Sequence, residues 1–302
     1  MFKSILTAYL LVAMASVGLT VSDLLFKQIL MQGGSVIQLM ALFIPAFLLV
    51  MLALAAMQGG IQHHYKLRYP WLMVARSVFV ISFTMLSLWG LSHNPYSQHA
   101  MLLQIAPVLT ALTAVWMLGE RLSVGQWALA GLCMFGVVLI INPQLHIASA
   151  YLLLPVMAAV CQSIGNVFVA RHREKATALG FTFWGAVGGW LVGMLLWLGQ
   201  GAPAMATDLW MLTQGIAVIM ALSIAALLRG LQTAAAQGHA GTAGLMMYLQ
   251  MPTALILGWL VLGEMPKLNA VAGAAVIVCA GVVLVLIHTR QQLATKPIQG
   301  QF

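Results

Sequence analysis

The chain has 302 residues, of which 62% are hydrophobic and only 6% are charged. Soluble domains are roughly 25% charged, so this composition excludes an ordinary water-exposed surface and indicates a protein that lies in a membrane. The net charge of +8 would suit a nucleic-acid partner. Basic loops beside a lipid bilayer explain it better, and no nucleic-acid partner is expected.

Apolar runs of helical length follow one another along the chain. A helix needs about 20 apolar residues to cross the hydrocarbon core, and no alternating pattern typical of strands is present. We predict an all-α polytopic membrane protein with ten transmembrane helices. In chain order the runs lie near 5–30, 36–58, 71–92, 97–118, 125–142, 149–170, 179–199, 211–234, 242–262 and 268–288.

The first run could instead be a secretory signal peptide, because Lys3 precedes an apolar stretch that contains Ala13-Met14-Ala15. An internal similarity argues for a retained helix. The segment from Tyr9 to Lys27 resembles the segment from Tyr151 to Arg171, about 142 to 144 residues later. We therefore expect the first run to stay in the protein.

A longer passage also occurs twice. Gln104 to Glu120 reads QIAPVLTALTAVWMLGE, and Leu249 to Glu264, about 145 residues later, reads LQMPTALILGWLVLGE. We predict two related five-helix halves, residues 1–145 and 146–290, followed by a cytoplasmic tail, residues 291–302. Because five is an odd number, the two halves would cross the membrane in opposite senses, as inverted repeats do.

The basic residues near the ends of the runs predict the orientation. With both termini in the cytoplasm, nearly all of them fall on the cytoplasmic side, and Lys267 is the clear exception. The residues on the cytoplasmic side are Lys3, Lys66, Arg68, Arg121, Arg171, Arg173, Lys175, Arg290 and Lys296.

Arg76, the sequence APVLTALTAVWMLGERLSVGQW at 106–127 and GVVLIINP at 136–143 resemble the first EamA-type repeat of the drug/metabolite transporter superfamily. Residues 228–264 resemble the second repeat. The resemblance implies a ten-helix secondary transporter of the bacterial inner membrane, with cytoplasmic termini and a small-molecule substrate in a cavity between the halves. It favours export of a small amino-acid-like, anionic or zwitterionic metabolite. An importer of a vitamin or nucleotide-like metabolite is the alternative, and a non-transporting membrane sensor or interaction partner is a third interpretation.

Motifs of enzymatic chemistry do not occur in the sequence, which has no Walker A, HExxH or GxSxG pattern. We expect neither enzyme activity nor a cofactor. Cys133, Cys161 and Cys279 lie singly in apolar runs, so no metal or disulfide role is predicted. Active transport would then draw on a gradient, and the proton is the candidate coupling ion. A uniporter or exchanger would leave the same sequence.

Charged residues inside apolar runs are the first candidate site residues, because a charge at mid-membrane costs roughly 2.5 to 3.5 kcal/mol. Asp23 and Lys27, four residues apart, are predicted to act in coupling or gating, or else to form an ion pair at the outer interface. Arg76 either binds substrate or anchors in lipid head groups. Arg229 beside Gly230 would bind a carboxylate or phosphate if it faces the cavity.

Uncharged polar and aromatic residues complete the candidate substrate site. Gln104 and Gln250 occupy near-equivalent places before two prolines, and the alternative for them is hydrogen bonding between helices. Asn166 is a weaker candidate of the same kind. Tyr248 and Trp184 would offer flat apolar contacts to a solute.

Two features of the helices bear on motion and assembly. Pro107 and Pro252 are predicted hinges, because proline frees a carbonyl in the preceding turn and kinks a helix. Gly189 and Gly193 form a GxxxG pattern. Packing within the monomer is the favoured interpretation of that pattern, and a homodimer face is the alternative.

Overall fold

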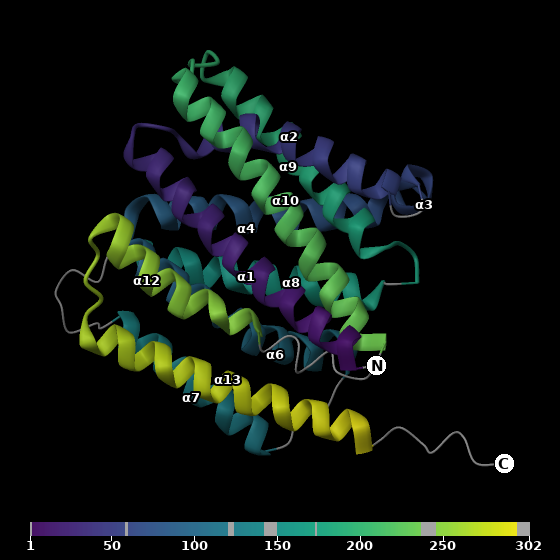
Figure 1. Cartoon of the computed structure of the whole chain (residues 1–302), viewed down its shortest axis with the longest axis vertical. Coiled ribbons are helices and arrows are strands. Elements are labelled where there is room, and N and C mark those ends of the chain that lie inside the picture. The colour runs from purple at the N-terminus through teal and green to yellow at the C-terminus, as the bar shows by residue number, and fades with distance from the viewer. Residues whose placement is uncertain are drawn as a thin grey trace.

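The structure is a computed structural model that describes residues 2–57, 60–119, 124–141, 150–172, 174–236 and 246–294. All regular elements in these ranges are helices, and they lie together in one bundle (Figure 1). Up to residue 141 the helices are α1 (Phe2–Met31), α2 (Val36–Met57), α3 (Ile61–Tyr65), α4 (Pro70–His93), α5 (Tyr96–Leu103), α6 (Ala106–Leu118) and α7 (Val124–Ile141). From residue 150 they are η1 (Ala150–Leu152), α8 (Leu153–Arg171), α9 (Ala178–Gly199), α10 (Thr207–Ala236), η2 (Met246–Leu249), α12 (Gln250–Leu262) and α13 (Leu268–Ala294).

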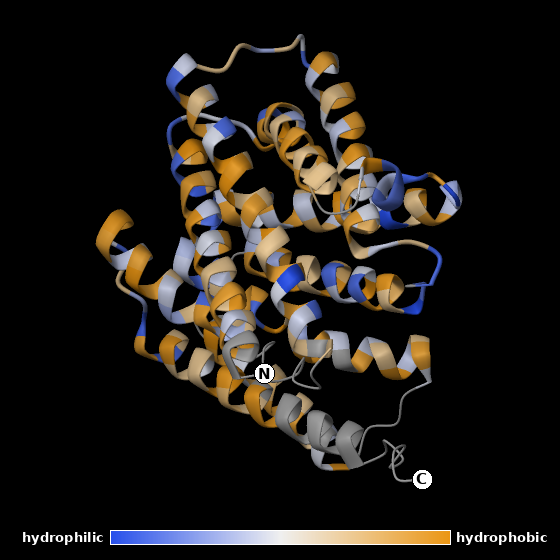
Figure 2. Cartoon of the chain, turned by 45° about the vertical axis from the view of Figure 1, so that its right-hand side comes forward, coloured by the Kyte–Doolittle hydropathy of each residue, from blue (hydrophilic) through white to orange (hydrophobic). Residues whose placement is uncertain are grey.

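The helices are apolar along most of their length, and the hydrophilic residues lie mainly at helix ends and in loops (Figure 2). Within the described ranges, seven segments are long and apolar enough to cross a membrane: Leu6–Met31, Val36–Met57, Pro70–His93, Tyr96–Leu118, Ala150–Arg171, Ala178–Gly199 and Thr207–Ala234. Three shorter apolar helices are Trp127–Ile140, Met246–Leu262 and Leu268–Ala280. The predicted all-α class is thus confirmed for the described residues, which fit a polytopic membrane protein, whereas ten crossings remain a prediction.

Helices from the first part of the chain pack on helices from the second part. α1 packs along α10, α4 packs between α8 and α9, and α2 packs against α9 and α10. α7 and α13 lie side by side at one edge of the bundle (Figure 1). Residues before and after position 146 therefore share one core, which places any internal cavity between them.

The contact between α7 and α13 depends on two glycines. A Cβ atom on Gly136 would lie 2.8 Å from the carbonyl oxygen of Gly273, and Gly273 in turn lies against the backbone of Gly136 and Ile140. Asn269 donates a hydrogen bond to the carbonyl of Leu139 across the same interface at 3.1 Å. The two backbones can approach this closely because neither glycine has a side chain.

The two predicted hinge positions coincide with breaks in regular helix. Gln104 and Ile105 separate α5 from α6, and Pro107 is the second residue of α6. In the second copy the chain changes from the 3₁₀ helix η2 to α12 at Gln250, two residues before Pro252. Proline suits these places because the first turn of a helix needs no N–H donor. A hinge motion at either break stays a prediction.

The two glycines of the GxxxG pattern pack against another helix of the same chain. Gly189 and Gly193 are both buried, and Gly193 lies against the backbone of Met40 and Ala41 in α2. This face of α9 therefore serves packing inside the monomer, which was the favoured interpretation.

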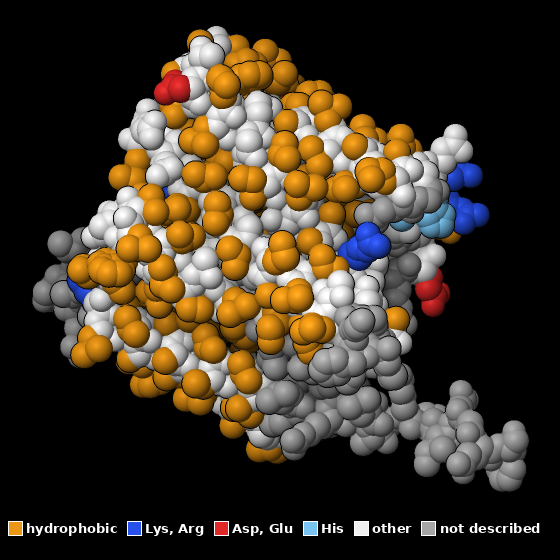
Figure 3. Space-filling view, viewed as in Figure 1, with side chains coloured by type: hydrophobic (Ala, Val, Ile, Leu, Met, Phe, Trp, Pro, Cys, Tyr) orange, Lys and Arg blue, Asp and Glu red, His pale blue; other side chains and the backbone are white. Residues whose placement is uncertain are grey.

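Basic loops gather at one end of the bundle. Lys175 lies over the rings of Tyr69 and Trp71, and Thr177 donates to the carbonyl of His64. In Figure 3 most of the Lys, Arg and His side chains on the visible face lie near its right-hand edge, whereas hydrophobic side chains are spread over the middle of the face. Such a gathering of basic residues agrees with the orientation predicted from the sequence, which stays a prediction.

A candidate substrate cavity

A cavity of about 300 Å³ lies inside the bundle and is lined by residues of α1, α2, α4, α5, α8, α9 and α10. Its walls thus come from both the first and the second part of the chain. Ligand pockets generally measure about 300 to 1,000 Å³, so this cavity suits a small metabolite.

One wall of the cavity is aromatic. Phe26 and Phe43 meet edge to face with their ring centroids 5.1 Å apart, and Phe47 stacks on Phe43 at 5.8 Å. Phe79 and Phe83 of α4 also line the cavity. Interlocked rings of this kind form a stiff apolar surface that can contact an aliphatic or aromatic part of a solute.

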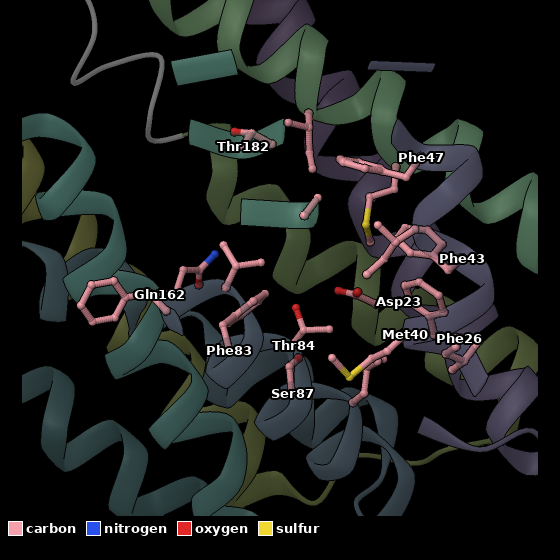
Figure 4. A pocket seen from close by; sticks show the side chains of 18 of the residues that line it. Asp23, Phe26, Met40, Phe43, Phe47, Phe83, Thr84, Ser87, Gln162 and Thr182 are labelled. Carbon is pink, nitrogen blue, oxygen red and sulfur yellow. The ribbon is translucent and has the colours of Figure 1, made fainter. Parts of the chain in front are cut away.

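Asp23 is the acidic residue of the cavity lining. Figure 4 shows its carboxylate inside the cavity beside Phe43 and Met40, where it faces Thr84. In the described part of the chain, no residue donates a hydrogen bond to this carboxylate or forms an ion pair with it. A carboxylate without a protein partner is available to a cationic group of a ligand or to a proton.

Lys27 is not the partner of Asp23. Its Nζ donates instead to the carbonyl oxygens of Leu91 at 2.8 Å and Asn94 at 2.9 Å, at the end of α4. Lys27 is buried and does not belong to the cavity lining. The predicted ion pair on one helix face is therefore not what this structure contains.

Arg76 is the basic residue of the cavity lining. A Cβ atom at Gly165 of α8 would overlap its Nη1, and one at Gly185 of α9 would lie 3.5 Å from its Cγ. Its Nε is buried and has no hydrogen-bond partner among the described residues. The side chain thus points between α8 and α9 into the protein, which favours the substrate-binding interpretation over anchoring in lipid head groups.

A substitution at Gly165 tests this placement without changing any charge. Gly165→Ala is expected to push the guanidinium of Arg76 aside, because the end of a flexible side chain gives way more easily than backbone. We expect substrate affinity to fall severalfold. Thermal stability in detergent is measured on the same variant and should fall slightly, because the new Cβ atom would also lie 3.1 Å from the Cβ atom of Phe79 on α4. Equal affinity in parent and variant would show that the position of Arg76 is irrelevant to binding.

Uncharged polar groups extend the lining. Thr84 and Ser87 lie on α4, Gln162 and Asn166 on α8, and Thr182 on α9. Ser87 is held from behind by His99 of α5, whose Nε2 lies 3.2 Å from the Ser87 hydroxyl. Thr84 and Ser87 were not among the predicted site residues. Their spacing of eight and eleven residues from Arg76, which places all three on one face of a helix, was the signal that would have found them.

Four other predicted site residues lie outside the cavity lining. Gln104 and Gln250 bind each other, with Nε2 of Gln104 3.1 Å from Oε1 of Gln250. This was the alternative interpretation, and the pair joins the two helix breaks. Tyr248 is buried, and its hydroxyl has no partner among the described residues. Trp184 donates from Nε1 to the carbonyl of Tyr65 at 3.1 Å.

Arg229 is also absent from the lining and is exposed on α10. Beside it, Gly230 lies against Ala8, Leu11 and Val12 of α1. The glycine therefore serves helix packing. The predicted role of Arg229 in substrate binding gains no support from its position.

A bundle of apolar helices around an internal cavity with two unpaired charges is the architecture of a polytopic membrane transport protein. Residues 4–142 match the EamA-like transporter family. This match confirms, for that part of the chain, the resemblance stated from the sequence. A transporter family implies a membrane environment and a small-molecule substrate.

Two further proteins are similar to the chain. One is a "Probable terminal-alkyne amino-acid exporter" of Streptantibioticus cattleyicolor, 28% identical over 260 residues, which are 82% of this chain and 84% of that protein. The other is a solved structure described only as "Crystal structure of protein", with a TM-score of 0.64 and 18% identity over 94% of this chain and 98% of the other. The second likeness concerns the fold alone.

Proposed function

We propose that the protein is a secondary transporter that exports a small zwitterionic, amino-acid-like solute by alternating access. The observation that carries the proposal is the pair of opposite charges, Asp23 and Arg76, in one small and otherwise largely apolar cavity. The carboxylate would receive the amino group of the solute and the guanidinium its carboxylate. The aromatic wall would contact an apolar side chain.

Electrostatics supports this assignment. An unpaired charge at mid-membrane is expensive, and a solute with the opposite charge removes that cost. Arg76 and Thr84 are eight residues apart, which is a rise of roughly 12 Å along α4. Because Asp23 faces Thr84 (Figure 4), the two charged groups lie at two levels of the cavity, and the solute has to be long enough to reach both.

The wider proposal includes ten crossings, two inverted five-helix halves and cytoplasmic termini in a bacterial inner membrane. The pairing of helices from before and after residue 146 supports the two halves. The basic loops around Lys175 support a cytoplasmic location of that end. In this orientation a solute entering from the cytoplasm meets Arg76 first and Asp23 deeper in the membrane.

Export and proton coupling are the finer parts of the proposal. The relative named as an amino-acid exporter supports both the direction and the solute class. Asp23 would be the proton carrier, because it is the acidic residue of the lining and has no protein partner in the described chain. Import of a nucleotide-like metabolite is less compatible with the cavity, since its phosphates would be repelled by Asp23.

Solute counterflow into proteoliposomes that contain the full chain tests the proposal. We expect radiolabelled apolar amino acids to exchange against internal unlabelled solute. The N-acetyl derivative loses the ammonium group and the methyl ester loses the carboxylate, so both should compete poorly. Absence of counterflow for every amino acid, or equal competition by both blocked derivatives, would contradict the zwitterion assignment. Competition by nucleotides alone would favour the importer.

A further inference from the structure

A polar network lies beside one end of the cavity, at the place where α1, α4 and α12 end. Lys27 of α1 reaches across and donates to the carbonyl oxygens of Leu91 and Asn94. Leu91 also lines the cavity. The ammonium group of Lys27 therefore ties the last turn of α4 to α1 directly beyond the cavity wall.

Glu264 makes a second tie at the same end. It follows Gly263, whose φ of 66° turns the chain back after α12. Its Oε1 accepts the N–H of Tyr96 at 2.6 Å, and its Oε2 accepts both the N–H and the hydroxyl of Ser97 at 2.8 Å. A carboxylate at this position satisfies the free N–H groups at the start of α5 and is favoured by the helix dipole.

The turn between α4 and α5 is thus held from several directions. The Tyr96 hydroxyl donates to the carbonyl of Thr20 in α1 at 2.8 Å, and the Tyr96 side chain is fully buried. Asn94 donates to the carbonyl of Tyr151 in η1 at 2.8 Å. Lys27 forms hydrogen bonds with the α4 side of this turn, and Glu264 forms hydrogen bonds with its α5 side. The opposite charges of Lys27 and Glu264 are close enough to attract each other.

We propose that Lys27 and Glu264 form a latch that holds this end of the cavity closed and that must release the α4–α5 turn for the cavity to open there. The inference rests on the proposed alternating access. It also gives a role to the second Gly-Glu pair of the repeated passage, which contributes nothing to the cavity lining. Both residues act on access and not on the solute.

The chemistry of the ties suits a contact that opens and closes. Replacing buried charges by well-packed apolar side chains is often neutral or stabilising, so a permanent seal would not need them. The bonds of Lys27 and Glu264 go to backbone groups at helix ends, which water can satisfy once the turn moves away. Charge-assisted hydrogen bonds also have a defined geometry, so the closed position is specific.

A cysteine reporter in the cavity measures the latch. Thr84→Cys is placed in a chain that lacks Cys133, Cys161 and Cys279, and a membrane-impermeant maleimide is added to right-side-out and to inverted vesicles. Glu264→Gln keeps the shape of the side chain but removes its charge and one acceptor. We expect labelling from the side of the latch to become about tenfold faster, because loss of a charge-assisted hydrogen bond shifts the closed-to-open equilibrium.

Lys27→Met is expected to act in the same direction, and Glu174→Gln, an exposed acid in the loop after α8, is the matched control. Should Glu264→Gln fail to insert, Ser97→Ala removes one bond of the same carboxylate in a milder way. Unchanged labelling in Glu264→Gln, or in Ser97→Ala where that replaces it, overturns the latch. Counterflow is measured in parallel: faster labelling with no counterflow by the parent would keep the latch and reject the proposed transport.

Discussion

Replacing Asp23 by Asn is expected to weaken binding of a zwitterionic solute about 10- to 100-fold. A hydrogen bond to a charged group contributes about 1.5 to 3 kcal/mol, and each 1.4 kcal/mol is tenfold in Kd. Binding is measured in detergent and transport by counterflow. Stability should not fall, because the carboxylate has no protein partner in the described chain and a neutral amide is easier to bury.

Arg76→Gln is the complementary change and should cause a loss of similar size. The two variants are expected to differ in which blocked derivative still competes more weakly than the free amino acid. Without the carboxylate of Asp23, the N-acetyl derivative should compete as well as the free amino acid. Without the guanidinium of Arg76, the methyl ester should do so. This crossed pattern distinguishes direct contact with the solute from a general defect in the helices.

Matched controls are available at exposed positions outside the cavity lining. Asp208→Asn, in the first turn of α10, and Arg68→Gln, between α3 and α4, are expected to leave binding and counterflow unchanged. Arg229→Gln tests the other arginine that the sequence singled out. Parent-like binding in Asp23→Asn and Arg76→Gln, or a larger loss in Arg229→Gln, would remove this cavity as the substrate site.

Gly136→Ala is expected to lower the stability of the protein by about 1 to 3 kcal/mol, the usual cost of overpacking. The new Cβ atom would lie 2.8 Å from the carbonyl oxygen of Gly273 and 2.8 Å from the Cγ1 atom of Ile277. The backbone cannot give way as a side chain does, so α7 and α13 must move apart. The measurement is the midpoint of thermal unfolding in detergent.

Gly131→Ala on the same helix is the control for this prediction. A Cβ atom there meets nothing within 4 Å, and alanine favours helix over glycine by about 1 kcal/mol. We expect this variant to be as stable as the parent or more so. If both alanine variants unfolded at the same midpoint, the close approach of α7 and α13 would have no energetic consequence.

The candidate site was only partly predictable from the sequence. Asp23 and Arg76 stand out because charges inside apolar runs are rare and costly. Gln104, Gln250, Tyr248 and Trp184 are polar or amphipathic groups of the same general kind, yet they lie outside the lining. Sequence position gives the depth of a residue in its helix, but the direction of its side chain depends on how the helices pack.

The hydroxyl and aromatic lining illustrates the same limit. Phe43 and Phe47 read as ordinary apolar residues of a span, and Thr84 and Ser87 read as weakly polar ones. These residues become part of a candidate binding site only because α1, α2 and α4 surround a common cavity. Lys27 was predicted to lie beside Asp23 but binds two carbonyl oxygens at the end of α4 instead. The sequence of α1 does not reveal these acceptors, because they come from another helix.

The sequence by itself determined the solvent of this protein, its helical class, the place of the apolar runs and the repeated passage. These follow from local quantities, since the hydropathy of a run and the need to satisfy backbone hydrogen bonds within it are properties of the segment. Only the tertiary structure decided which polar residues share the cavity and which hold one another. Those outcomes depend on the packing of helices far apart in the chain, where a glycine such as Gly165 or Gly273 sets how closely two elements approach.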